Sequence, residues 1–294
     1  MKITVLSGPD RNENYGDCFI IDDSNNLYIY DCGSQKLADE VINYMRTNNY
    51  SKATAILSHN DSDHFNGLEY LVNKGKIEKV YTVCLLKYID EILDAIGDGR
   101  KSRDSLRNQI LTRYDNIKKL SGYLEDIYPL EKKITSQISL VGPNKDYMIE
   151  AVAHELNTLE GDRIDGETVV NATSVQVKIV LDNGNEVLLC GDCSFEAIKE
   201  KVNDYNIIQL PHHGKEEQAK AIFGAVSDVK EKVFIVSDNT GPTNGGSDER
   251  NFIGKVVKNT KSLGTFVIDE TVLKSSTGYV PKKSLGCQYD ILFR

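Results

Sequence analysis

Short apolar runs alternate with helical patterns over residues 3–86. The runs ITVLSG, DCFIIDD and NLYIYDCGS are rich in apolar residues and are separated by Gly, Asn and Asp, which predicts three strands joined by turns. Apolar residues then recur at helical spacing in KLADEVINYMRTN, at Leu37, Val41, Ile42 and Met45. KATAILS and KVYTVCLL predict two further strands, with a short helix in GLEYLVNKG between them. Strands that alternate with helices indicate an α/β layered fold.

The segment from Lys87 to Pro129 breaks this rhythm. Its apolar residues recur every three or four positions and predict one long amphipathic helix: Leu106, Ile110, Tyr114, Ile117, Leu120 and Leu124. The segment is also rich in cations: Arg100, Lys101, Arg103, Arg107 and Arg113. Such a row is most simply a solvated helix face, and it could instead form a lid that guides an anionic substrate.

Strands return after residue 129. QISLVG, TSVQVKIVLDNG and NEVLLCGDC predict three strands, the last two joined by a tight turn at NGNE. SFEAIKEKV predicts a helix, and NIIQLPHHG predicts a strand that runs into a His-His-Gly loop. KVFIVSDN, GTFVIDETV and the tail predict the last strands, and GPTNGGSDERN a flexible loop. Because no low-complexity linker interrupts the chain, we expect one domain over residues 1–294, with a helical insertion at residues 87–129.

Composition narrows the classes of function. The 294 residues can bury a sizeable core, and the net charge of -9 argues against a broad nucleic-acid-binding surface, although a basic patch or a bound metal would override that average. No stretch approaches the length of a membrane span, and MKITVLSGPD lacks the apolar region of a secretory signal. The six cysteines mostly lie in apolar contexts, so we expect a cytoplasmic protein with buried thiols.

Histidine and aspartate gather at the ends of three predicted strands. SHNDSDHFNG, at residues 58–67, follows one strand, and LLCGD and LPHHG end two others, which is where α/β sheets form their sites. Helix capping would explain one Asp of the first motif but not its two histidines. Imidazole and carboxylate suit zinc, manganese or iron, and so many ligands predict two ions about 3.5–4 Å apart. These ligand-type residues include four of the five histidines and are His59, Asp61, Asp63, His64, Asp192, His212 and His213.

These motifs resemble those of metallo-β-lactamase-fold hydrolases, in the branch that contains the soluble hydrolase domain of the DNA-uptake protein ComEC. The loop of that superfamily usually reads His-x-His-x-Asp-His, and this branch has Asp in the second position, as HNDSDH does. YGDCFIIDD and IYDCGS resemble its first motif, with Asp31 as the buried acid. NATSVQVKI resembles its Asn-x-x-Ser strand, LLCGD its bridging-acid strand and LPHHG its final His motif. The resemblance implies a four-layer αββα sandwich.

The resemblance also implies a role for each residue of the first motif. His59 and Asp61 would hold one metal ion, and Asp63 and His64 the second. Asp192 would bridge the two ions, which would be zinc or manganese. Asp63 and Asp192 would also orient the attacking water.

The remaining ligands are less clear from the motifs. His212 or His213 would complete the second ion, and the other of this pair could donate a proton or contact the substrate. The third histidine of the first ion has one candidate, His154 in AVAHEL, which we expect at a strand end, although a lone histidine is as often a packed or surface residue. ComEC-like chains tend to carry Gly-His-Pro after the last core strand, whereas this chain reads SDNTGPTNGG. Either the first site is weak, or Asp238 or another group stands in.

The implied activity is hydrolysis of an anionic ester by metal-activated water. The branch and the basic helix favour a phosphodiester, in a nucleic acid or a nucleotide, and the acidic net charge disfavours it. Two alternatives stay open. Cys190 and Cys193 in CGDC could form a thioredoxin-type redox pair, and the missing Gly-His-Pro histidine would suit a binding or scaffold module that has lost catalysis.

Overall fold

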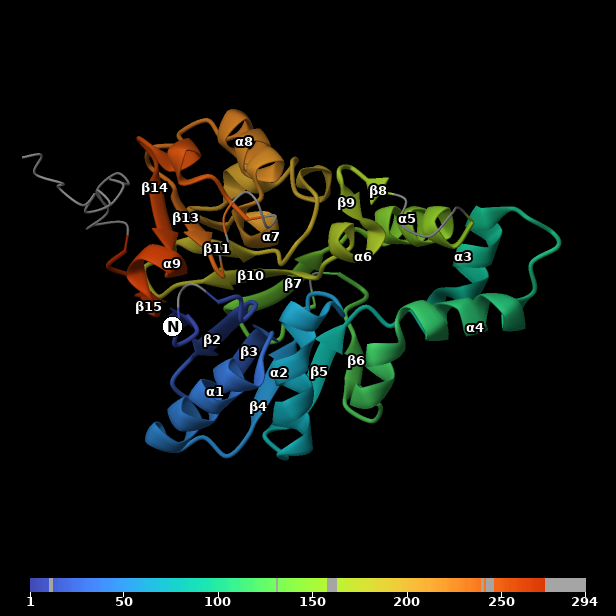
Figure 1. Ribbon diagram of the computed structural model, residues 1–294, viewed down its shortest axis with the longest axis horizontal. Helices are drawn as coiled ribbons and strands as arrows, with labels where there is room; N and C mark the ends of the chain where they lie inside the picture. The colour runs from blue at the N-terminus through green and yellow to red at the C-terminus, as the bar shows by residue number, and fades with distance from the viewer. Residues whose placement is uncertain (11–12, 131, 158–162, 239–240, 242–245, 273–294) are drawn as a thin grey trace, which may run out of the picture.

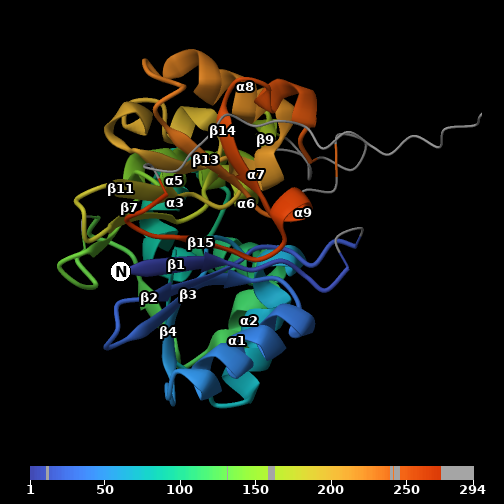
Figure 2. The same ribbon diagram turned by 90° about the vertical axis from the view of Figure 1, so that its left-hand side faces the viewer.

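Two mixed β-sheets face each other at the centre of the computed structural model, and helices cover their outer faces (Figure 1). The structure describes residues 1–10, 13–130, 132–157, 163–238, 241 and 246–272. Figure 2 shows the two sheets nearly edge-on, with α1 and α2 beyond one sheet and α8 beyond the other.

The first sheet contains seven strands. The strands at one edge pair antiparallel, whereas β3, β4, β5 and β6 run parallel. In sheet order they are β15 (Phe266–Ile268), β1 (Lys2–Val5), β2 (Cys18–Asp22), β3 (Leu27–Cys32), β4 (Ala53–Ile56), β5 (Ile77–Thr82) and β6 (Leu124–Asp126).

The second sheet contains six strands. β10 pairs antiparallel with both β7 and β11, which confirms the predicted tight turn, and the strands from β11 to β14 run parallel. In sheet order they are β14 (Val256–Asn259), β13 (Val233–Val236), β12 (Ile207–Gln209), β11 (Glu186–Leu189), β10 (Gln176–Val180) and β7 (Ile138–Gly142). A separate hairpin joins β8 (Arg163–Ile164) to β9 (Glu167–Thr168).

Nine α-helices and several 3-10 turns occur in the described part of the chain. The α-helices are α1 (Gln35–Thr47), α2 (Ser62–Asn73), α3 (Ile89–Ile96), α4 (Arg103–Arg113), α5 (Lys145–Asn157), α6 (Val169–Ala172), α7 (Pro211–Gly214), α8 (Glu216–Ala225) and α9 (Thr260–Leu263). The 3-10 turns are η1 (Leu85–Tyr88), η2 (Asp115–Leu120), η3 (Phe195–Ala197), η4 (Val202–Asp204) and η6 (Glu249–Phe252).

Three apolar clusters separate the four layers. In β2, Phe19 and Ile21 face the cluster between the sheets, while Ile20 faces α1 and α2. In β11, Val187 points between the sheets, and Leu188 points toward the helices that cover the second sheet. Because both faces of each sheet are buried, the strands are continuous apolar runs rather than alternating ones. The predicted αββα sandwich is confirmed.

The prediction of one long helix between residues 87 and 129 is wrong. Two α-helices, η1, η2 and β6 share this segment, and Figure 1 shows α3 and α4 to one side of the two sheets. The break has a local cause, because Gly97 ends α3 in the left-handed conformation with φ 65° and Ser102 caps a new helix. The boundaries of the helical insertion, residues 87–129, stay a prediction.

Most cations of the basic row have partners, which favours the solvated face over the guiding lid. Arg100 pairs with Asp98, Arg103 with Asp90 and Arg113 with Glu155, while Lys101 donates to the carbonyl of Leu156.

Two local predictions fail elsewhere. SFEAIKEKV forms the short η3 and further turns that lead into η4 instead of a continuous helix, and the amide of Phe195 donates to Oε1 of Gln218 while Nζ of Lys201 donates to the carbonyl of Val141. Helix α5 replaces the strand that was expected at His154. The strands expected in the tail lie at residues 273–294, outside the described residues, as do residues 242–245 of the flexible loop. No helix in the described ranges is long and apolar enough to cross a membrane.

Candidate metal centre

Loops at the carboxyl ends of strands from both sheets meet at one place. β4 leads into residues 57–61, β11 into residues 190–193, and β12 into α7. The two sheets are joined here, since the amide of Val175 donates to the carbonyl of Ser58 at 2.9 Å and the hydroxyl of Tyr30 to the carbonyl of Val175 at 2.7 Å. The clusters expected at strand ends are therefore brought together.

Close packing fixes the backbone of the first motif. A Cβ at Gly16 would lie 1.9 Å from the carbonyl oxygen of Asp63, and one at Gly33 would lie 2.1 Å from the same atom. The amide of Asp17 donates to this oxygen at 2.9 Å. Asp61 precedes α2 but makes no capping bond with its side chain, so helix capping does not account for it. The loop around Asp63 is therefore shaped by its contacts with Gly16, Asp17 and Gly33 rather than by its own helix.

Two histidines of the first motif are oriented through Nδ1. Nδ1 of His64 lies 2.8 Å from Oδ2 of Asp31, whose Oδ1 accepts the amide of Ser58 at 2.7 Å. Nδ1 of His59 lies 2.9 Å from the hydroxyl of Ser58 and 3.2 Å from that of Ser174. An imidazole held at Nδ1 presents Nε2 as its free ligand atom, as metal-binding histidines do.

The two histidines of the last motif follow the same rule. Nδ1 of His212 lies 2.8 Å from Oε2 of Glu167, and Nδ1 of His213 lies 3.1 Å from Oδ1 of Asp17. Both residues have left-handed backbones, with φ 53° and 54°, and Gly214 follows with φ 75°. Left-handed conformations at non-glycine residues are costly and concentrate at functional sites. The strained turn allows two adjacent imidazoles to face the same space.

The Nε2 atoms converge on Asp192. Nε2 of His64 lies 3.2 Å from Oδ1 of Asp192, and Nε2 of His212 and His213 lie 3.8 and 4.0 Å from its Oδ2. Nε2 of His213 is also 3.2 Å from Oδ2 of Asp63. A buried carboxylate with three imidazoles around it could hold a cation together with them.

Orphaned polar atoms test whether a metal would fit. Nε2 of His59, Nε2 of His64 and Oδ1 of Asp192 are buried and make no hydrogen bond of good geometry within the described part of the chain, although the last two atoms lie 3.2 Å apart. Leaving such atoms without a partner is costly, and a cation among them would satisfy all three. Ligand atoms within 4.8 Å of one another form four groups in the described part of the chain, and two of these groups, His59–His64–Asp192 and Asp63–His64–His213, consist entirely of predicted ligands. These buried clusters are consistent with a dinuclear metal site.

The charges of the site balance one another. Burial alone would lower the pKa of His64, but the carboxylates of Asp192 and Asp31 raise it well above its ordinary value. The pKa of His213 is raised likewise, mainly by Asp192. Burial would raise the pKa of Asp192, but His64 and His213 hold it well below its ordinary value, and the hydrogen bond with His213 lowers the pKa of Asp63. A divalent cation could replace the imidazolium protons.

Four other candidate ligands lie outside these two groups. Asp61 approaches His59, with 3.6 Å between Oδ2 and Nε2, but its side chain is 48% exposed. His212 faces Asp192, with 3.8 Å between its Nε2 and Oδ2 of Asp192. His154 is exposed on α5. Asp238 accepts the amides of Tyr15 and Gly16, an engagement that fixes the N-terminal loop.

Sequence reasoning missed the acids that orient the last two histidines. Asp17 lies inside YGDCFIIDD, next to the residues that carried the resemblance, so its position in that motif was an available signal. Glu167 follows the hairpin turn between β8 and β9, and nothing in the local pattern marks it.

The cysteine pair does not suit redox chemistry. Cys190 and Cys193 are fully buried and unbridged. Burial and the neighbouring Cys193 raise the pKa of the Cys190 thiol well above its ordinary value. Because the thiolate is the reactive form, this environment suppresses the exchange reaction.

A model of a known protein family matches most of the chain. The sequence model described as Metallo-beta-lactamase superfamily matches residues 11–237. No curated protein matches the chain. Similar solved structures include Igni18, a metallo hydrolase from Ignicoccus hospitalis, with 12% identity over 92% of this chain and 99% of that one and a TM-score of 0.49. The metallo-beta-lactamase fold protein YhfI from Bacillus subtilis has 13% identity over 91% of this chain and 98% of that one, with a TM-score of 0.47. The short form of human tRNase Z has 12% identity over 92% of this chain and 99% of that one, with a TM-score of 0.44.

The family match includes every residue of both ligand groups, from His59 to His213. It also includes both orienting acids, Asp17 and Glu167. The chain belongs to the metallo-beta-lactamase superfamily.

Proposed function

We propose that this protein is a dinuclear metal-dependent hydrolase of anionic esters, and that its substrate is a phosphodiester, in a nucleic acid or a nucleotide. One observation carries the first part: four histidines are held at Nδ1 while their Nε2 atoms face buried or half-buried aspartates. The choice of a phosphodiester is supported by the resemblance of HNDSDH and its companion motifs to the ComEC-like branch.

The residue roles that the motif resemblance implies give two ligand sets. His213 is the better ligand of its pair, because it is buried and groups with the first motif, whereas the side chain of His212 is 25% exposed. The ions would be zinc or manganese, since imidazole and carboxylate suit both. The sets share Asp192 and consist of His59 and Asp61 on one side and of Asp63, His64 and His213 on the other.

The chain's own residues divide the remaining work. Two divalent ions bound here would lower the pKa of a water molecule toward neutrality and neutralise charge on the substrate. The carboxylates of Asp63 and Asp192 would accept hydrogen bonds from that water and fix its position. His212 would deliver a proton from Nε2 to the leaving oxygen, because Glu167 holds its Nδ1.

Glu167 is itself prepared for this role. Its Oε1 accepts from Nζ of Lys215 at 2.8 Å and from Nε2 of Gln218 at 2.9 Å. Burial would raise the pKa of Glu167, but the hydrogen bond with His212 and the charge of Lys215 lower it. Glu167 therefore stays ionised and keeps the His212 ring turned toward Asp192.

Metal content tests the proposal directly. Protein purified without chelator is expected to hold about two divalent ions per chain, and Asp192→Ala to hold fewer and to lose phosphodiesterase activity. Asp228→Ala removes an exposed carboxylate far from the site and serves as the control. A folded protein that takes up neither zinc nor manganese would instead be a binding module.

A further inference from the structure

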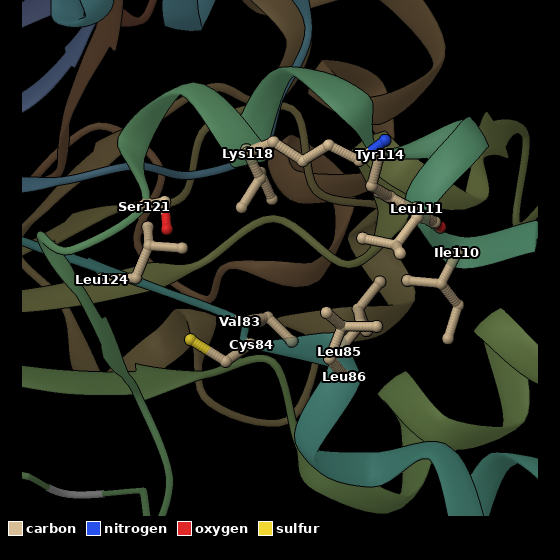
Figure 3. A pocket seen from close by; sticks show the side chains of 11 residues that line it. Val83, Cys84, Leu85, Leu86, Ile110, Leu111, Tyr114, Lys118, Ser121 and Leu124 are labelled. Carbon is tan, nitrogen blue, oxygen red and sulfur yellow. The ribbon is translucent and has the colours of Figure 1, made fainter. Parts of the chain in front are cut away.

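An apolar pocket of about 280 Å³ lies between α4 and the residues that follow β5 (Figure 3). Ile110 and Leu111 from α4 face Val83 and Leu85 across it, and Cys84 lies beside them. Leu86, one of the few exposed large apolar side chains in the described structure, also lines it with 40% of its surface exposed. The mechanism proposed above leaves this pocket unused.

The pocket adjoins the metal centre. A narrower hollow of about 20 Å³ is lined by His59 and Asn60 of the first motif. The pocket and the hollow share four wall residues, which are Val83, Leu85, Tyr114 and Ile117. The pocket and the hollow beside His59 are therefore adjacent, with these four side chains between them.

Hydrogen bonds hold the pocket wall against the site. Nδ2 of Asn116 donates to the carbonyl of Asn60 at 3.2 Å, which ties η2 to the first motif. The hydroxyl of Tyr114 donates to Oε2 of Glu155 at 2.7 Å, which ties the end of α4 to α5. The wall is thus built into the fold, and the Tyr114 hydroxyl is already engaged.

The lining selects for an apolar occupant. Apart from backbone, its polar groups are the exposed Lys118 and Ser121, the thiol of Cys84 and the engaged hydroxyl of Tyr114. A nucleobase buried here would leave several donors and acceptors without partners, whereas an alkyl or aryl group would lose nothing. We propose that the substrate carries an alkyl or aryl group that reaches past His59 and fills this pocket. The inference rests on the proposed hydrolase activity but not on a nucleic-acid or nucleotide substrate, which this lining disfavours.

A substrate series tests the pocket. The metal-loaded protein would be assayed with p-nitrophenyl alkyl phosphodiesters from methyl to octyl, which share one leaving group. Each methylene that enters the pocket is expected to raise kcat/KM about fourfold until the pocket is full. Thymidine 5′-(p-nitrophenyl phosphate) is expected to be no better than the methyl ester. A flat alkyl series, or a faster nucleotide ester, would overturn the inference.

Matched variants on α4 assign the effect to the pocket. Leu111→Trp fills the pocket from a half-buried position and is expected to lower the octyl-to-methyl ratio of kcat/KM at least tenfold. Thr112→Trp adds the same side chain at an exposed neighbour outside the lining and should leave the ratio unchanged. Equal ratios in the two variants would contradict the assignment.

Cys84 offers a readout that needs no hydrolysis. It is half-buried in the pocket, while the four other cysteines of the described chain are fully buried, so alkylation by N-ethylmaleimide can be assigned to Cys84 by peptide mass spectrometry. Octylphosphonate is expected to slow its alkylation at least tenfold, and methylphosphonate to have no effect. Protection without hydrolysis would support the pocket and overturn the proposed activity. Hydrolysis without protection would overturn the pocket alone.

Discussion

His212 and His213 are neighbours in the chain, yet their rings have different surroundings. His213 is buried between Asp17 and Asp63, whereas His212 is partly exposed and held by Glu167. Replacing each residue should therefore have a different effect on metal content and activity.

We expect His213→Gln to lose metal and activity together. His212→Gln should keep its metal and lose about 10²–10⁴-fold in kcat, which is the contribution typical of a general acid. Metal content and kcat of both variants, measured on the same preparations, check this. A His212→Gln protein that lacks one ion would show that His212 is a ligand instead.

Metal affinity should rise with pH, because the imidazoles of His64 and His213 must lose their protons before they can bind a metal ion. The carboxylates raise the pKa of His64 and His213 well above the ordinary value of about 6.5, so in the metal-free protein both rings carry protons that a metal must displace. The pKa values of Asp63 and Asp192 are lowered, so these carboxylates stay ionised throughout. Apparent zinc affinity, measured with a competing chelator, is expected to rise from pH 6 to pH 8. An affinity that is flat over this range would contradict the protonated state.

The same raised pKa values affect the metal-free fold. A proton held more tightly in the folded than in the unfolded state stabilises the fold. For His64 and His213 this stabilisation is complete below about pH 6.5 and is lost as pH rises through their raised folded pKa values. The metal-free protein should therefore become less stable as pH rises, while metal binding becomes stronger.

At the scale of elements, the loop that contains HNDSDH is shaped by the loops that pack on it. Gly33→Ala would place a methyl group 2.1 Å from the carbonyl oxygen of Asp63, where the backbone cannot yield cheaply. We expect this variant to lose about 2–4 kcal/mol in the free energy of unfolding and to bind metal more weakly.

Gly224→Ala, in α8, is the control for this experiment. A Cβ there would meet nothing within 4 Å, so the change should stabilise the helix by about 0.5–1 kcal/mol. Urea unfolding of both variants compares the two sites. Equal stability of Gly33→Ala and the parent protein would mean that the loops can separate.

Most strands were predictable because they are apolar runs bounded by turn residues, and burial on both faces keeps such runs continuous, whereas β6, β8, β9 and β14 were not predicted. Helical periodicity failed where local chemistry interrupts it. The helix predicted across residues 87–129 included Gly97 and Gly99, but the backbone breaks there, because Gly97 ends α3. SFEAIKEKV also has a helical pattern but forms only short turns, with hydrogen bonds to Gln218 and Val141 near its two ends.

At the scale of the molecule, the site exists only where the two sheets meet. Asp63 and His213 are 150 positions apart in the chain, and Asp17 and His213 are 196 apart, yet each pair is in contact. Local pattern identified the ligand-type residues and an α/β fold, and the motif resemblance supplied the arrangement of layers. Neither marks Glu167, because an acid that orients a histidine needs no motif of its own.

Because the proposed ligands follow strands of both sheets, removing the metal should destabilise the whole molecule. Free metal at a hundredfold excess over its dissociation constant stabilises a fold by about 2.7 kcal/mol, which for a chain of this size is a shift in Tm of roughly 5–10 °C. We expect EDTA to lower the Tm of the parent and of Asp228→Ala by this amount. Asp192→Ala, which lacks the carboxylate between the halves, should show a smaller shift because it holds less metal. If the parent protein contains metal but its Tm does not change when EDTA is added, the ions do not join the two sheets.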